Sequence, residues 1–271
     1  MKSASHTKGR LASATLLDLR DTGPAAEGPF ADLADTRLVV HPDADPVFVE
    51  QYRRLAAVLH QAQLRGGIRS VMVASAVAAE GKTLSATNLA LMLSHSFRKR
   101  VLLVDGDLRK PAVHQMFQLE NGIGLTDILK RPAGRLPAHI LSPTLSLVTG
   151  GQPDRDPVGL LVSESARQLL AQTREEFDWV VVDTPPVVLF PDAGLFADWL
   201  DTCLMVVGSA TTPSSVAAKA VAAIGAGRIL GIVLNRVEPT EIAAGYGYGP
   251  YKDVPGGGPA DQFLWRHPSR R

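Results

Sequence analysis

A Gly-Lys-Thr triplet, residues 81–83, is the part of the sequence best suited to bind phosphate. The apolar residues 70–75 before it predict a short buried strand, and residues 84–96 after it predict a helix. Strand, loop and helix in this order form a P-loop, in which backbone N–H groups and the helix N-terminus bind phosphate oxygens. We expect Lys82 to reach the β- and γ-phosphates of a nucleotide and the Thr83 hydroxyl to bind Mg²⁺.

The loop before this triplet departs from the usual pattern at its first glycine. Ala76 occupies that position, which gives the pattern A-x4-G-K-T. Alanine carries the smallest side chain after glycine, so we expect the loop to keep its shape. Nucleotide contacts are expected from the residues of the loop and the helix start: Ala78, Ala79, Glu80, Gly81, Lys82, Thr83 and Leu84.

Three aspartates follow two further apolar segments. Asp105 and Asp107 come directly after residues 101–104, and Asp183 ends the apolar segment 177–182. The carboxyl ends of parallel strands meet at one edge of a sheet, which is where ligands bind. Two aspartates so close together are also ordinary turn residues. Beside a phosphate loop, carboxylates are better suited to hold a metal ion or to accept a proton.

Charge and composition exclude several classes of protein. The 271 residues carry 28 basic and 27 acidic side chains and a net charge of +1, without a basic stripe for nucleic acid. The single cysteine, Cys203, lies in an apolar run and is expected to be buried. No signal peptide and no apolar run of about 18 residues are found, so we expect a cytoplasmic protein.

Strand and helix patterns alternate through the middle of the chain. They predict an α/β fold for residues 46–238, P-loop NTPase-like, with a mostly parallel central sheet and helices on both faces. Residues 1–45 are expected to be a flexible N-terminal arm, although residues 36–40 are compatible with one short strand. Residues 239–271, rich in Gly, Pro and Tyr, are expected to be a flexible tail.

Three local patterns in this domain matter below. Asp45 and Pro46 predict the start of a helix, whose Glu50, Arg53 and Arg54 lie off the apolar stripe and are either solvated or part of a subunit contact. Another amphipathic helix is expected over residues 157–174. A last strand, residues 228–234, is followed by Asn235, which is suited equally to an adenine edge and to capping its own loop.

The tail contains three of the four tyrosines of the chain, Tyr246, Tyr248 and Tyr251. Glycine flanks them, and no apolar pattern predicts a core around them. By composition alone the segment is a low-complexity tail. Beside a phosphoryl-transfer site, the same exposed hydroxyls become candidate phosphate acceptors.

These motifs together resemble the bacterial tyrosine kinase (BY-kinase) family, cytoplasmic autokinases of capsule and exopolysaccharide synthesis. The loop at residues 76–83 resembles their first nucleotide motif, and residues 101–109 resemble a second motif that ends in D-x-D-x-R. Residues 180–186 resemble a third motif that ends in D-x-x-P, and the tail tyrosines resemble the family's C-terminal cluster. The resemblance covers roughly residues 47–251.

The resemblance implies transfer of the γ-phosphoryl group of ATP to tail tyrosines, with Mg²⁺ as the metal. It implies catalytic roles for Lys82, Asp105, Asp107 and Asp183, with Asp107 receiving or orienting the tyrosine proton. Thr83 and Asp183, supported by Asp105, would hold the metal. Nucleotide contacts would also come from Arg109, and Asn235 is added from its place in the sequence.

The resemblance further implies a set of partners. These are a transmembrane polysaccharide co-polymerase or adaptor that activates the kinase and recruits it to the inner face of the membrane, a cognate tyrosine phosphatase, and further copies of the chain. Two positions depart from the family. Ala56 replaces the second arginine of an E-x-x-R-x-x-R oligomerisation motif that begins at Glu50, and Ala79 replaces a loop glycine.

Two other functions fit the same nucleotide motifs. One is a ParA/MinD-like ATPase switch without kinase activity, although such proteins carry an extra loop lysine where this chain has Val77. The other is a regulatory module that binds a nucleotide and transfers no phosphate. ATP hydrolysis without phosphotyrosine would favour the first, and binding without either activity would favour the second.

Overall fold

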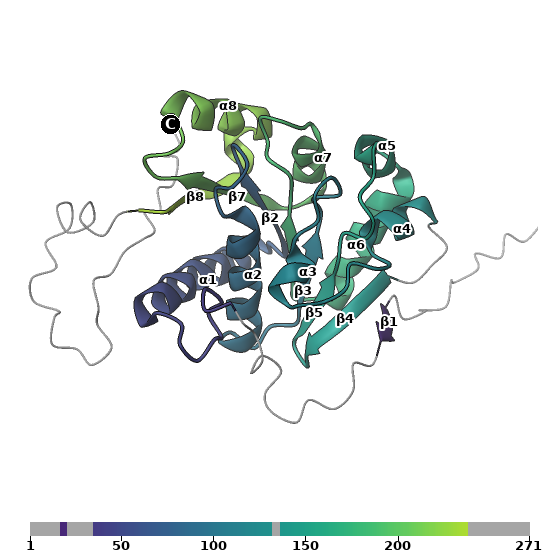
Figure 1. The fold of residues 1–271 in the computed structure, drawn as a ribbon, viewed down its shortest axis with the longest axis horizontal. Helices are drawn as coiled ribbons and strands as arrows, with labels where there is room; N and C mark the ends of the chain where they lie inside the picture. Colours follow the sequence, from purple (N-terminus) through teal and green to yellow (C-terminus); the bar gives the residue numbers. More distant parts are fainter. Residues whose placement is uncertain (1–16, 21–34, 132–135, 238–271) are drawn as a thin grey trace, which may run out of the picture.

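Eight strands form the central sheet of the computed structural model, which describes residues 17–20, 35–131 and 136–237 (Figure 1). The sheet order is β1-β4-β5-β3-β6-β2-β7-β8, and every neighbouring pair is parallel except β4 and β5. The strands are β1 Leu17–Arg20, β2 Ser70–Ser75, β3 Val101–Asp105, β4 Leu136–Ser142, β5 Leu145–Val148, β6 Trp179–Asp183, β7 Thr202–Gly208 and β8 Ile229–Asn235.

Helices cover both faces of this sheet, as the sequence predicts. They are α1 Pro46–Gly66, α2 Lys82–His95, α3 Val113–Met116, α4 Leu125–Lys130, α5 Pro157–Leu161, α6 Glu164–Glu176, α7 Asp192–Trp199 and α8 Ser214–Ile224, with a 3₁₀ turn at Ala226–Arg228. Helices α1 to α3 pack on one face of the sheet and α4 to α8 on the other. The core therefore lies in two layers, one on each side of the sheet.

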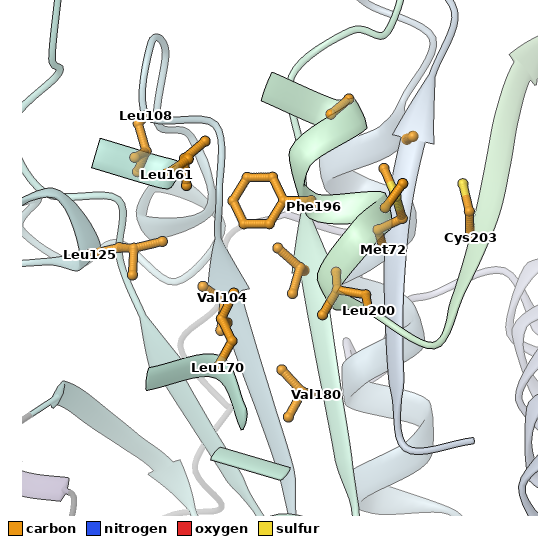
Figure 2. Packing of buried hydrophobic residues seen from close by; sticks show 14 of the residues in the cluster. Met72, Val104, Leu108, Leu125, Leu161, Leu170, Val180, Phe196, Leu200 and Cys203 are labelled. Carbon is orange, nitrogen blue, oxygen red and sulfur yellow. The ribbon is translucent and has the colours of Figure 1, made fainter. Parts of the chain in front are cut away.

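The alternation of side chains along β2 shows how one strand supplies both layers. Val71 and Val73 pack toward α1 and α2, whereas Met72 and Ala74 pack in the layer that contains Phe196 of α7 (Figure 2). Strands buried on both faces are continuous apolar runs rather than alternating ones, which is why the sequence marks them clearly. Cys203 of β7 is fully buried in the same layer, as expected.

The parallel register places the ends of three strands side by side. Asp105 at the end of β3 is the direct partner of Asp183 at the end of β6, and Asp183 is also paired with Val73 of β2. Helix α2 begins at Lys82, after the loop that follows β2. The carboxyl edge of the sheet thus brings together the segments that the sequence marks for phosphate and metal binding.

The N-terminal boundary differs from the prediction. Residues 36–40 form turns rather than a strand, and Leu38 and Val39 are buried against α1 and α2. The Asn88 amide fixes them, because its oxygen accepts from the Val39 N–H at 2.9 Å and its nitrogen donates to the Arg37 carbonyl at 2.9 Å. The packed region therefore begins before residue 45. Strand β1, which pairs with β4, also lies inside the segment expected to be an arm.

Two further elements differ from the sequence patterns. Strand β4 was not predicted, because proline and polar residues interrupt its apolar pattern, and it is held as an antiparallel partner of β5. The helix expected over residues 157–174 is two helices, since α5 ends at Leu161 with Val162 as its C-cap, and Ser163 caps α6 by accepting from the Ala166 N–H at 3.2 Å. The predicted Asp45 cap of α1 is confirmed, with its carboxylate 2.8 Å from the Val47 nitrogen.

Candidate active site

The loop between β2 and α2, the candidate phosphate loop, contains two residues with a positive φ. Ala79 has a φ of 64° and Gly81 a φ of 92°. The positive φ of Gly81 favours glycine, and a Cβ there would also lie 2.2 Å from the Asn235 amide nitrogen. Ala78 and Ala79 are exposed at the tip of the loop, while Leu84 packs against the core from the first turn of α2.

Ala79 provides a direct test of this loop. Because an L-residue is strained in the left-handed region and glycine is not, we expect Ala79→Gly to raise the free energy of unfolding by about 0.5–1 kcal/mol. Ala78→Gly is the matched control: Ala78 has no positive φ, so the same change there should give no gain. Urea unfolding measures both, and equal effects of the two substitutions would contradict the assignment of strain to Ala79.

Glu80 connects the phosphate loop to the end of β7. Its buried carboxylate accepts from the Val77 N–H at 2.8 Å, from the Gly208 N–H at 3.0 Å and from the Thr212 hydroxyl. The Asn235 amide nitrogen donates to the Glu80 carbonyl at 2.8 Å. Both side chains were expected to bind the nucleotide. Here Glu80 shapes the phosphate loop, and Asn235 contacts both that loop and its own, since its oxygen accepts from the Arg236 N–H at 3.0 Å. Its contact with an adenine edge stays a prediction.

A cation and two carboxylates meet directly beside this loop. The Lys82 amine lies 3.1 Å from an Asp107 oxygen and 3.4 Å from both Asp183 oxygens, and the Thr83 hydroxyl donates to Asp183 at 2.6 Å. Lys82 is only 11% exposed and Asp183 is fully buried. Residues that are far apart in sequence and were expected to act on one ligand therefore converge.

Burial and charge shift the titration of this cluster in a consistent way. Burial alone would lower the pKa of Lys82, but the charges of Asp183 and Asp107 outweigh it and raise the pKa. Burial raises the pKa of Asp183, although Lys82 and the Thr83 hydroxyl oppose the increase. Lys82 thus stays cationic at neutral pH, which is the state required to bind phosphate.

Asp105 ends β3 and organises the loop that follows it, residues 106–110, which we call the acidic loop. One of its oxygens accepts from the N–H groups of Ala112 and Val113, at 2.8 and 2.9 Å, and the other from the Asp107 N–H at 3.3 Å. Complete burial, together with the nearby Asp183 charge, raises the pKa of Asp105 to about 7. Asp105 thus contacts backbone on both oxygens and supports the site from behind.

This pKa makes stability depend on pH. The folded chain keeps the Asp105 proton up to about pH 7, whereas the unfolded chain loses it near 3.8, so the free energy of unfolding falls as pH rises through that window. Asp105→Asn keeps one oxygen to accept from the Ala112 and Val113 N–H groups, and it removes the carboxyl proton whose loss causes the pH dependence. In metal-free buffer, the melting temperature of the unaltered protein should fall between pH 5 and pH 8. The fall in the variant should be smaller by a few degrees (~2–4 °C per kcal/mol). Equal pH dependence in both proteins would contradict the assignment.

Arg109 was expected to contact the nucleotide, but the structure pairs it elsewhere. Its guanidinium donates to both oxygens of Asp192, at 2.7 and 3.0 Å, and lies 4.4 Å from the centre of the Phe190 ring. The Asp192 hydrogen bonds raise the pKa of Arg109. Neither Phe190 nor Asp192 was identified from the sequence, because nothing in the local pattern links them to residue 109.

The oxygen donors of the site fit a magnesium ion. Thr83 and Asp183 present hard oxygen atoms 2.6 Å apart beside the phosphate loop. Within the described ranges, no three His, Cys, Asp or Glu side chains cluster closely enough to bind a metal by themselves. Mg²⁺ does not require such a cluster, since it is usually bound by one or two carboxylates together with substrate phosphates and water.

The tail tyrosines and the oligomerisation motif are not part of this cluster. Tyr246, Tyr248 and Tyr251 lie outside the described residues. Tyr52 of α1, the one tyrosine in the described part of the chain, is 2% exposed. Glu50 forms ion pairs with Arg53 and Arg54 of its own helix on an exposed surface, so these side chains are at least partly satisfied within α1.

Comparison with known proteins first gives the class of domain. Residues 71–245 match the model of the CobQ/CobB/MinD/ParA nucleotide-binding domain. This match agrees with a parallel sheet that carries a phosphate loop after β2 and with the acidic residues at its carboxyl edge. The chain is thus a nucleotide-binding domain of the P-loop type. Among the described residues, no helix is both long and apolar enough to cross a lipid bilayer.

Closer relatives specify the family. The chain is 35% identical over 208 residues to the tyrosine-protein kinase YwqD of Bacillus subtilis, a match that covers 75% of this chain and 87% of YwqD. The solved kinase domain of the Escherichia coli tyrosine kinase ETK has a TM-score of 0.65 at 29% identity, over 70% of this chain and 75% of that one. The chain belongs to the bacterial tyrosine-protein kinase family.

Other members of this family are much longer. The tyrosine-protein kinase Wzc of Salmonella typhi is 35% identical over 162 residues, and the match covers 58% of this chain but only 22% of Wzc. The likeness to Wzc therefore concerns only a small part of that longer kinase.

Proposed function

We propose that this chain is an ATP-dependent protein-tyrosine autokinase that transfers the γ-phosphoryl group of ATP to Tyr246, Tyr248 and Tyr251. The observation that carries the proposal is the meeting of Lys82, Asp107 and Asp183 within 3.4 Å at the end of a phosphate loop. The kinship with tyrosine-protein kinases such as YwqD supports the choice of tyrosine as acceptor.

Different residues of the site have different roles in phosphoryl transfer. The amides of the loop and the Lys82 amine bind the phosphates, and Thr83 and Asp183 hold Mg²⁺, with Asp105 supporting them from behind. The metal supplies positive charge that stabilises the phosphoryl oxygens as the transition state forms. Catalysis then depends mainly on positioning and charge neutralisation by these groups.

Asp107 is the candidate proton acceptor. The tyrosine oxygen forms a bond to the γ-phosphorus, the bond from that phosphorus to the bridging oxygen breaks, and ADP leaves with the bonding electron pair. The phenol proton passes to the Asp107 carboxylate, which lies 3.1 Å from the Lys82 amine and is 8% exposed. A free tyrosine has a pKa of about 10, so an adjacent carboxylate assists the transfer at neutral pH.

The proposal extends to the cellular role. We place the kinase in the regulation of exopolysaccharide synthesis or export, where a transmembrane co-polymerase or adaptor activates it and recruits it to the inner face of the membrane. A cognate tyrosine phosphatase would reverse the modification, and further copies of the chain would serve as partners. Mass spectrometry of the purified protein with ATP, with and without a cytoplasmic adaptor fragment, tests whether phosphotyrosine increases with the fragment.

Phosphotyrosine and ATP hydrolysis, measured on the same sample, separate this function from a ParA/MinD-like switch. Phosphotyrosine that appears only with ATP and Mg²⁺ is expected for an autokinase. ATP hydrolysis without phosphotyrosine would instead assign the chain to the switch ATPases. The nucleotide-binding family model includes such proteins, so this alternative needs the direct test.

A further inference from the structure

The loop that carries the candidate proton acceptor Asp107 is fastened by a contact from a segment far along the chain. Arg109, two residues after Asp107, forms two hydrogen bonds with Asp192, the first residue of α7. Asp192 is only 1% exposed, and the Phe190 ring lies beside the same guanidinium. Two parallel, charge-assisted hydrogen bonds fix the orientation of the arginine as well as its distance.

The segment that ends at Asp192 also touches the phosphate loop. The Val187 N–H donates to the Ser75 carbonyl at 2.9 Å, and the Val188 N–H donates to the Ala76 carbonyl at 3.2 Å. The segment begins shortly after Asp183. Residues 187–192 therefore contact the first residues of the phosphate loop at one end and the acidic loop at the other.

The acidic loop is also close to β6 at its other end. The Gly106 N–H donates to the Asp183 carbonyl at 2.7 Å, and a Cβ on Gly106 would lie 2.8 Å from that oxygen. Asp107 thus lies between two contacts, one made by the backbone at Gly106 and one made by the side chain of Arg109. Of these, only the second can be altered by side-chain substitution without disturbing the backbone.

We propose that Asp192 and Phe190 are positioning residues of the kinase, and that they hold Arg109 so that Asp107 stays directed toward Lys82. Arg109 is then a structural link between the acidic loop and residues 187–192, and not a ligand of the nucleotide. The inference rests on the proposed function for its consequence on rate. The link itself is a property of the fold and can be measured without kinase activity.

The first arm of the test measures the link. Arg109→Lys keeps the charge but loses the paired hydrogen-bond geometry, and Asp192→Asn keeps the shape but loses the charge. We expect faster amide hydrogen exchange in residues 106–110 and 187–192 in both variants. The control is Arg228→Lys with Asp198→Asn, an exposed Arg–Asp pair that also involves α7, and it should leave these segments unchanged. Unchanged exchange in Asp192→Asn overturns the inference, whatever the kinase activity.

The second arm measures rate and nucleotide affinity separately. Since a displacement of about 1 Å can cost about 10²-fold in rate, we expect each variant to lower the autophosphorylation rate at saturating ATP by about 10- to 100-fold. The dissociation constant of a fluorescent ADP analogue should change by less than about threefold, because no nucleotide contact is removed. The double variant should be no slower than the slower single one, since both substitutions break one link.

Other outcomes have defined meanings. A weaker ADP affinity in Arg109→Lys alone would make Arg109 a nucleotide ligand and overturn the inference. A lower melting temperature with a normal rate per folded molecule would mean that the Arg109–Asp192 contact serves stability alone, and this result would also overturn the inference. Asp192→Glu keeps the carboxylate and should retain more activity than Asp192→Asn, which guards against simple misfolding. Absence of phosphotyrosine in the unaltered protein would refute the proposed function, while the exchange arm would still decide the link.

Discussion

Autophosphorylation is expected to fall by on the order of 10²–10³-fold when Lys82 is replaced by methionine, because the variant loses the cation directed at the transferring phosphoryl group. Lys82 also balances the charges of Asp107 and Asp183, both within 3.4 Å of its amine. The measurement is the initial rate of ATP-dependent phosphotyrosine formation, followed by mass spectrometry. Robust labelling of the Lys82→Met protein would refute the assignment of the site.

The controls for this experiment must separate chemistry from folding. Removing one partner of a buried ion pair commonly costs about 3–5 kcal/mol, so thermal unfolding of Lys82→Met has to be recorded in parallel. Lys82→Arg keeps the positive charge beside the two carboxylates and should fold more stably than Lys82→Met. Lys219→Met removes the same kind of side chain at an exposed position of α8 that is not part of the Lys82 cluster, and this variant should label normally.

Most autophosphorylation is also expected to disappear when Tyr246, Tyr248 and Tyr251 are replaced together by phenylalanine. The physical reason is access: of the four tyrosines, Tyr52 is buried at 2% exposure, and its hydroxyl lies 3.4 Å from the Ser85 hydroxyl. The phenol is enclosed in the layer between the sheet, α1 and α2, so its hydroxyl is not accessible as a phosphate acceptor in the folded protein. The measurement is total phosphotyrosine per molecule, with sites located by peptide mass spectrometry.

Tyr52→Phe is the matched control for the triple variant. It removes one hydroxyl from a tyrosine that we expect never to be labelled, so phosphotyrosine should stay at the level of the unaltered protein. The unaltered protein, the triple tyrosine variant and Tyr52→Phe should bind the ADP analogue equally, because none of these tyrosines belongs to the phosphate loop. Labelling of the triple variant at the unaltered level would place the acceptor outside the tail cluster.

The local elements of the fold were largely evident in the sequence. Strands such as β2 and β6 are continuous apolar runs, and buried parallel strands require such runs. The Gly-Lys-Thr triplet at residues 81–83 marks the phosphate loop, and the aspartates at the ends of β3 and β6 mark its acidic partners. Prediction was wrong where neighbours override local pattern: β4 forms because β5 pairs with it, and residues 36–40 are turns held by Asn88.

The sequence alone thus determined the chemistry available to this protein: a cation, a hydroxyl and three carboxylates, each at the end or start of a recognisable element. Only the tertiary structure decided which groups meet. Asp105 and Asp183 are neighbours because β3 and β6 pair in parallel register, and Glu80 reaches Gly208 across 128 residues because β2 lies beside β7. Arg109 likewise meets Asp192 across 83 residues. Hydrophobic periodicity specifies that a segment is a strand or a helix, but strand order depends on contacts between distant segments, which no local pattern encodes.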